Sequence, residues 1–68
     1  MLNRIKELRE RASLTQEQLA ERVHVSRQTI ISLEKGRYNP SILLAYHIAQ
    51  AFRTHIERVF VFEEEESS

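Results

Sequence analysis

Apolar residues recur every three or four positions along most of this chain, which is the spacing of amphipathic helices. We predict helices over residues 2–12, 16–23, 27–35 and 42–52, followed by a single helical turn over 56–59. Their predicted inward faces carry Leu2, Ile5 and Leu8, then Leu19, Ala20 and Val23, then Ile30 and Leu33, and finally Ile42, Ala45, Ile48, Ala49 and Phe52. The pattern predicts an all-α fold with its core between the helices.

Polar residues precede three of these helices at positions typical of helix starts. Thr15 is followed three residues later by Gln18, the spacing of a capping box. Ser26 is an N-cap candidate for the third helix, and either Asn39 or Ser41 serves the fourth. Residues of these types accept hydrogen bonds from the free N–H groups of a first helical turn, so the boundaries are well specified.

The second and third predicted helices are joined by only two or three residues around His24. Gly36 ends the third helix at a position where a left-handed residue closes a helix at low cost. Two short helices joined so tightly must meet at a steep angle, which is the geometry of a helix-turn-helix. In that motif the second helix lies in the major groove of DNA.

Side chains on the outward face of the predicted third helix have the chemistry of base recognition. Arg27 can donate two hydrogen bonds to guanine, and Gln28 can pair with adenine in the same bidentate manner. Ile31 and Ser32 follow one turn later, where an isoleucine can contact a thymine methyl group. An ordinary solvated helix face is the alternative for these residues, and Ile31 is equally compatible with local packing.

The end of the chain changes from a helical pattern to a run of β-branched and aromatic residues. Residues 59–62 are Val, Phe, Val and Phe, which predicts a short strand. A lone strand leaves its backbone groups unpaired, and we find no second strand in this sequence. We therefore predict a homodimer in which the same strand of two copies pairs about a two-fold axis. The expected interface consists of Ile56, Val59, Phe60, Val61 and Phe62.

The charges are unevenly placed, although the ten basic and ten acidic residues of this 68-residue chain cancel formally. Four of the glutamates form the block at residues 63–66, so residues 1–62 carry ten basic and six acidic residues, a net charge of +4. A mildly basic body is compatible with a nucleic-acid partner. We expect residues 63–68 to be a solvated acidic tail directed away from DNA.

Composition excludes several other classes of protein. Without cysteine there is no disulfide or thiolate metal site, and His24, His47 and His55 lack the spacing of metal ligands. We find no nucleophile with a base and no glycine-rich phosphate loop, so we expect no enzymatic activity, cofactor or small-molecule ligand. We also find no signal-like start and no apolar run of about 20 residues, which favours a cytoplasmic protein.

Four segments in order carry a family resemblance. They are Leu-Thr-Gln-Glu-Gln-Leu-Ala at 14–20, Val-Ser-Arg-Gln-Thr-Ile at 25–30, Leu-Glu-Lys-Gly at 33–36 and Asn-Pro-Ser at 39–41. Together they resemble the helix-turn-helix regulators of the phage-repressor and Cro type, the xenobiotic-response-element-like family, over about residues 4–60. The resemblance implies a compact five-helix, lambda-repressor-like domain, which we place at residues 1–58, before the dimerisation strand predicted above at 59–62.

The resemblance also implies roles for individual residues. It assigns base contacts to Arg27, Gln28, Ile31 and Ser32, and DNA backbone contacts to Gln16, Thr29, Arg37, Tyr38, Asn39 and Ser41. It assigns a partly buried structural ion pair to Arg9 and Glu34. Three positions depart from the family pattern, because His24 and Arg53 replace common glycines and His55 replaces a common Ser or Thr cap.

We therefore expect a dimeric transcriptional regulator, in particular a repressor, that binds an inverted-repeat operator through the major groove. The alternative is a protein-interaction module, such as an antitoxin or adaptor, whose apolar C-terminal segment binds another protein. The polar residues on one side of the predicted motif favour the regulator.

Overall fold

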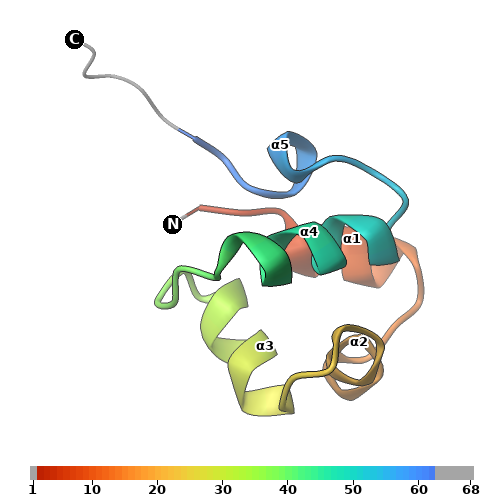
Figure 1. Cartoon of the computed structure of the whole chain (residues 1–68). Helices are drawn as coiled ribbons and strands as arrows, with labels where there is room; N and C mark the ends of the chain where they lie inside the picture. The colour runs from red at the N-terminus through yellow and green to blue at the C-terminus, as the bar shows by residue number, and fades with distance from the viewer. Residues whose placement is uncertain (1, 63–68) are drawn as a thin grey trace, which may run out of the picture.

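The computed structural model describes residues 2–62, which form five helices. They are α1 (Ile5–Arg11), α2 (Gln16–Val23), α3 (Arg27–Glu34), α4 (Ile42–Ala51) and α5 (Ile56–Val59). Figure 1 shows α1 and α4 in the middle of the molecule, with α2 and α3 on one side and α5 on the other. The predicted all-α fold with five helices is confirmed.

Side-chain caps fix the starts of α2, α3 and α4. The Thr15 hydroxyl accepts from the Gln18 N–H at 3.0 Å, and the Gln18 side chain accepts from the Thr15 N–H at 2.8 Å, which completes the predicted capping box. Ser26 caps α3. Of the two candidates for α4, Ser41 is the cap, because its hydroxyl accepts from the Leu44 N–H at 3.1 Å.

Left-handed residues make the connections between the helices short. His24 closes α2 with φ 63°, and Gly36 follows α3 with φ 74°. Histidine adopts this region less readily than glycine but more readily than most residues. Only residues 24–26 separate the two helices, so α3 starts close to the end of α2.

The core consists of apolar side chains from all five helices and from Phe60. Its buried members are Ile5, Leu19, Ala20, Val23, Ile30, Leu33, Ala45, Ile48, Ala49, Val59 and Phe60. Four residues expected on inward faces are not among them. Leu8 and Phe52 are partly buried against this core, whereas Leu2 is 62% exposed and Ile42 is 83% exposed. Ile42 is the first residue of α4 and projects beyond the core, although its spacing matches the buried stripe.

Two predictions are wrong at the N-terminal segment: the start of α1, and the lack of a partner for residues 59–62 within the chain. α1 begins at Ile5 rather than at residue 2. Arg4 is its N-cap, and the Asn3 side chain accepts from the Ile5 N–H at 3.0 Å. Residues 2–4 instead run beside residues 59–61. The Arg4 N–H donates to the Val59 carbonyl at 2.7 Å, and the Val61 N–H donates to the Leu2 carbonyl at 2.9 Å.

The expectation that residues 59–62 lack a partner within the chain was therefore wrong. Asn3 and Phe60 form an isolated antiparallel bridge, and residues 2–62 contain no regular strand. Val59 and Phe60 are 0% and 2% exposed within this one chain, which leaves their side chains no surface for a second copy. Of the other expected interface residues, Phe62 is exposed, whereas Ile56 and Val61 are half-buried. The predicted acidic tail lies outside the described residues.

The ion pair between Arg9 of α1 and Glu34 of α3 is present. The Arg9 Nε donates to Glu34 Oε2 at 2.6 Å and its Nη2 to Oε1 at 3.3 Å, while Nη1 donates to the Leu14 carbonyl at 2.9 Å. The side chains are only 12% and 6% exposed. The hydrogen bond to Glu34, together with the charge of that carboxylate, raises the pKa of Arg9 above its ordinary value although burial opposes it. Arg9 therefore remains charged.

We expect Phe60→Ala to destabilise the domain strongly, because it removes a fully buried ring from a small core. The cost in the free energy of unfolding should be about 3–5 kcal/mol. Urea unfolding followed by circular dichroism measures it. Tyr38→Ala, at an aromatic residue that is 45% exposed, is the control and should change stability by about 0.5 kcal/mol or less. Equal losses of unfolding free energy in Phe60→Ala and Tyr38→Ala would show that the core does not depend on the Phe60 ring.

Arg9→Ala should cost about 3–5 kcal/mol of folding free energy, since it leaves the Glu34 carboxylate buried without its charged partner. Arg11→Ala provides the matched control on the same helix. Its ion pair with Glu7 has side chains that are 75% and 52% exposed, so its loss should cost less than about 1 kcal/mol. Thermal melts of the two variants distinguish the cases, and similar melting temperatures would contradict a structural role for the Arg9 pair.

Candidate nucleic-acid interface

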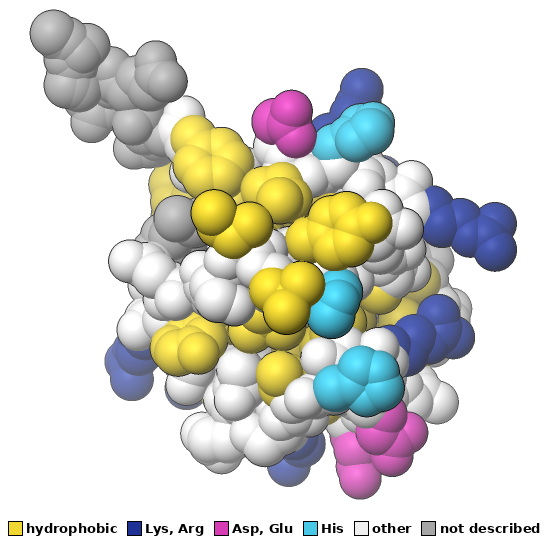
Figure 2. Space-filling view, viewed as in Figure 1, with side chains coloured by type: hydrophobic (Ala, Val, Ile, Leu, Met, Phe, Trp, Pro, Cys, Tyr) yellow, Lys and Arg dark blue, Asp and Glu magenta, His cyan; other side chains and the backbone are white. Residues whose placement is uncertain are grey.

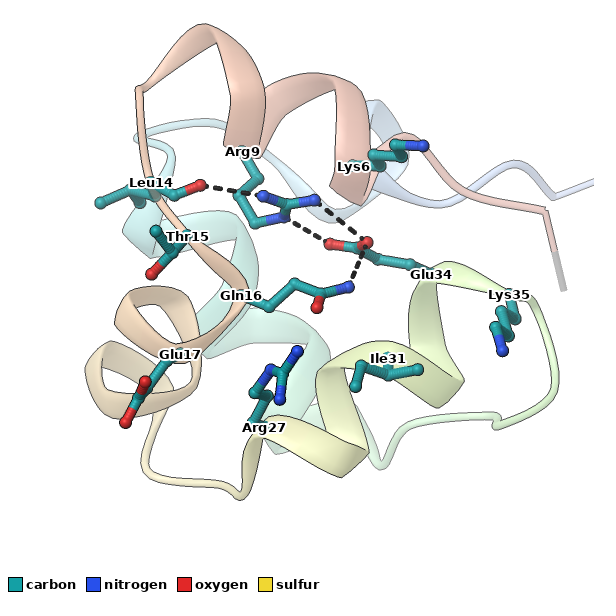
Figure 3. A pocket seen from close by; sticks show the side chains of 10 residues that line it. All are labelled: Lys6, Arg9, Leu14, Thr15, Gln16, Glu17, Arg27, Ile31, Glu34 and Lys35. Carbon is teal, nitrogen blue, oxygen red and sulfur yellow. Dashed lines mark hydrogen bonds and ion pairs between the residues drawn. The ribbon is translucent and has the colours of Figure 1, made fainter.

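A groove of about 730 Å³ lies between α1, the start of α2 and the outward side of α3. Figure 3 shows it from close by, with side chains entering from all three helices. It is lined by Lys6, Arg9, Leu14, Thr15, Gln16, Glu17, Arg27, Ile31, Glu34 and Lys35. The groove thus joins a predicted phosphate contact to two predicted base-contacting residues.

Gln16 is the first residue of α2 and is half-buried in the wall of the groove. Its Nε2 donates to Glu34 Oε1 at 3.1 Å, the oxygen that also accepts from Arg9 Nη2. The Glu34 carboxylate therefore connects α1, α2 and α3 through one buried group, as Figure 3 shows. A side-chain amide has two N–H donors, so Gln16 retains one beyond its bond to Glu34.

The outward face of α3 carries the four residues predicted to contact bases. Ser26 starts the helix, so Arg27 and Gln28 occupy its first turn, where both are exposed. Ile31 and Ser32 are half-buried one turn later, and the opposite face buries Ile30 and Leu33 in the core. Figure 3 shows the Arg27 side chain rising into the groove toward Gln16.

The predicted backbone-contacting residues after α3 are exposed but lie outside this groove. Arg37, Tyr38 and Asn39 belong to the loop between α3 and α4, which is anchored by the Arg37 N–H donating to the Ser32 carbonyl at 3.0 Å. Ser41 already caps α4. The half-buried Thr29 has its hydroxyl 3.1 Å from that of Ser26.

Two lysines with no predicted role in binding also line the groove. Lys6 comes from α1, and Lys35 is the C-cap residue that follows α3. Lys6 is one helical turn before Arg9, so the spacing already placed the two on one face. Since Arg9 was expected to contact Glu34 of α3, this relation could have identified Lys6 beforehand.

The charges of the groove favour an anion. Glu34 is compensated by Arg9, which leaves Lys6, Arg27 and Lys35 as cations against one further carboxylate, Glu17.

No set of three or more potential metal-ligating side chains is grouped anywhere in residues 2–62. No helix in that described range has the length and apolar character that crossing a bilayer requires.

Comparison with known proteins agrees with this architecture. A family model described as helix-turn-helix matches residues 5–59. An uncharacterized HTH-type transcriptional regulator of Archaeoglobus fulgidus is 58% identical over 66 residues, covering 97% of this chain and 93% of that protein. The immunity repressor protein of Bacillus phage phi105 is 38% identical over 56 residues, covering 82% of this chain but 39% of the repressor.

A solved structure shows the same fold. The restriction-modification controller protein C.AhdI from Aeromonas hydrophila superposes with a TM-score of 0.76 at 29% identity, covering 81% of this chain and 83% of that protein. The matched family model extends from the first residue of α1 to the last of α5. The chain therefore belongs to the helix-turn-helix family of the Cro and C1 type, whose members are DNA-binding transcriptional regulators and not enzymes.

Proposed function

We propose that the protein is a repressor that binds an inverted-repeat operator as a homodimer, with α3 in the major groove. The observation that carries this proposal is the two-sided character of α3. One face anchors the helix through the fully buried Ile30 and Leu33, while Arg27 and Gln28 are exposed on its first turn. A rigidly held helix with free donors at its start can enter a groove without rearrangement of the domain.

In the proposed complex, sequence is read by Arg27, Gln28, Ile31 and Ser32. Arg27 donates to guanine and Gln28 pairs with adenine, both by two hydrogen bonds. Ile31 is half-buried, so part of its surface remains for a thymine methyl group. Ser32, also half-buried, is suited to a single hydrogen bond rather than a bidentate one.

The proposed backbone contacts hold the domain in register on the duplex. Gln16 presents its remaining amide N–H at the start of α2, and the exposed Arg37, Tyr38 and Asn39 lie beyond the other end of α3. These two groups are separated along the recognition helix, so they suit the two backbones that border one major groove. Contacts of this kind add affinity but carry no sequence information. The proposal also keeps Thr29 and Ser41 as backbone contacts through their partly accessible hydroxyls.

An exposed apolar surface supports the proposed homodimer. It consists of Leu2, Ile42, Leu43, Tyr46 and Phe62, which are 50–83% exposed. Figure 2 shows apolar side chains gathered over α4 and the C-terminal end of the described chain. Exposed patches of this kind mark interaction sites. The interface we now propose therefore adds α4 to Ile56, Val61 and Phe62, and omits the buried Val59 and Phe60.

Repression is the form of regulation that needs the fewest assumptions. A small dimer on an operator blocks a promoter simply by occupying it. Among the relatives, the phage phi105 protein is named an immunity repressor and the Aeromonas protein is named a controller of restriction-modification. These names support the proposal for this chain by family membership.

In vitro selection from random duplexes should yield an inverted repeat with half-sites about one helical turn apart.

Arg27→Ala and Gln28→Ala should each cost about 1–3 kcal/mol of binding free energy on the selected site and relax the preference at particular base pairs. Arg37→Ala should weaken binding to all duplexes alike. It should also reduce the slope of log K against log salt by about one released counterion. Fluorescence anisotropy at several salt concentrations measures both. Uniform loss in all three variants would refute this division of roles.

Sedimentation equilibrium should show a dimer at micromolar concentration. Leu43→Glu places a charge in the proposed interface and should weaken dimerisation by at least about tenfold. Gln18→Glu is the control, because it adds the same charge on α2 and preserves the capping box. A wild-type protein that remains monomeric at this concentration would exclude the proposed dimer.

A further inference from the structure

We propose that Lys6 and Lys35 bind DNA phosphates, so that the groove contacts the sugar–phosphate backbone as well as the bases. This inference rests on the proposed function and extends it. It places α1, which lies outside the helix-turn-helix pair, in contact with DNA. It also assigns a ligand to two residues for which the sequence predicted no contact with DNA.

The geometry of the groove carries the proposal. Lys6 of α1 and Lys35 at the end of α3 line the same groove as Gln16 and Arg27. Figure 3 shows both lysines at the side where Glu34 lies, whereas Leu14 and Glu17 mark the opposite side. A duplex held at Gln16 and Arg27 therefore meets two further cations along the same groove.

The lysine charges have no partner among residues 2–62, the range that the structure describes. Both side chains are exposed, and neither forms a hydrogen bond or an ion pair with any residue in the range 2–62. By contrast, Arg9, the other basic residue of the inner wall, is committed to Glu34 and to the Leu14 carbonyl. The ammonium groups of Lys6 and Lys35 are therefore available to an external anion at no cost in internal contacts.

The floor of the groove does not oppose an anion either. The Glu34 carboxylate accepts two hydrogen bonds from Arg9 and one from Gln16, which compensates its charge. Figure 3 shows the Glu17 carboxylate directed away from the groove. The chemistry points to a polyanion rather than a single free anion, because the cations are spread along an open groove and do not converge on one point.

The contacts should position the protein without reading sequence. A lysine ammonium is a compact charge on a flexible stem, which suits a phosphate oxygen but not the bidentate pattern of a base edge. We therefore expect Lys6 and Lys35 to affect selected and random duplexes equally. This expectation separates them from Arg27, which lines the same groove.

The test measures the salt dependence of binding for Lys6→Gln, Lys35→Gln and the double variant, on the selected operator and on a random duplex. Each substitution should reduce the slope of log K against log salt by about 0.9, and the double variant by about 1.8. The loss of affinity per lysine should shrink about threefold between about 50 and 200 mM salt. The preference for operator over random duplex should stay unchanged.

Two controls separate this role from a loss of fold or of net charge. Lys6→Arg keeps the charge and should retain the wild-type slope. Arg58→Gln removes an exposed charge on α5, which Figure 1 places on the side of the molecule opposite α2 and α3, and should change the slope by less than about 0.3. Melting temperatures of all variants should match the wild type, since neither lysine forms a hydrogen bond or an ion pair within residues 2–62.

The outcomes also distinguish this inference from the proposed function. If the double variant keeps the wild-type slope while Arg37→Ala lowers it, the backbone does not enter this groove and only the present inference fails. If the double variant loses preference for the operator, the lysines read sequence and the inference is overturned. If the wild-type protein binds neither duplex, the proposed function itself fails, and this inference fails with it.

Discussion

The carboxylate of Glu34 is the group on which the arrangement of the first three helices depends. It accepts hydrogen bonds from Arg9 of α1 and Gln16 of α2, and it belongs to the last residue of α3. A carboxylate that is only 6% exposed needs such partners, because an uncompensated buried charge is costly. Its three hydrogen bonds, two from Arg9 and one from Gln16, therefore orient α3 and compensate a negative charge in the groove that we propose faces DNA. Structural and functional demands meet in one side chain.

A second constraint comes from the size of the domain. A chain of 68 residues has little apolar surface to bury, so its terminal segments must contribute to the core. The backbone pairing of residues 2–4 with 59–61 brings Val59 and Phe60 into contact with the helices. The Asn3 side chain also donates to the Leu33 carbonyl at 2.7 Å, which ties this pairing to the end of α3. The far end of the fold thus supports the recognition helix.

Local signals in the sequence predicted most of the helix boundaries. Thr15, Ser26 and Ser41 each accept from the backbone N–H three residues later. His24 follows α2 directly, and Gly36 lies two residues after the end of α3. Such interactions depend on neighbours in sequence, so spacing alone reveals them. The Arg9–Glu34 pair was expected only through the family resemblance, because no local pattern connects residues 25 positions apart.

The predictions that were wrong depend instead on contacts between residues that are distant in the sequence. Leu2 continues the helical spacing of Ile5, yet it pairs with Val61, which lies 59 positions later in the chain. Ile42 fits the inward stripe of α4, but a helix longer than the core it covers leaves its first residue exposed. The hydrogen bond between Gln16 and Glu34 depends likewise on how α2 meets α3. In each case tertiary contacts, which periodicity does not encode, decide the outcome.

The charge distribution resolves the apparent conflict between a formally neutral chain and a polyanionic ligand. What matters to a phosphate is the set of charges within about one Debye length, which is about 8 Å at physiological salt. In the groove that set is Lys6, Arg27 and Lys35 against the single carboxylate of Glu17, since Glu34 is compensated by Arg9. Exposed carboxylates elsewhere, such as Glu57 on α5, are screened from that surface. Net charge is therefore a poor guide for so small a domain, and the pairing state of each carboxylate near the recognition helix is the better one.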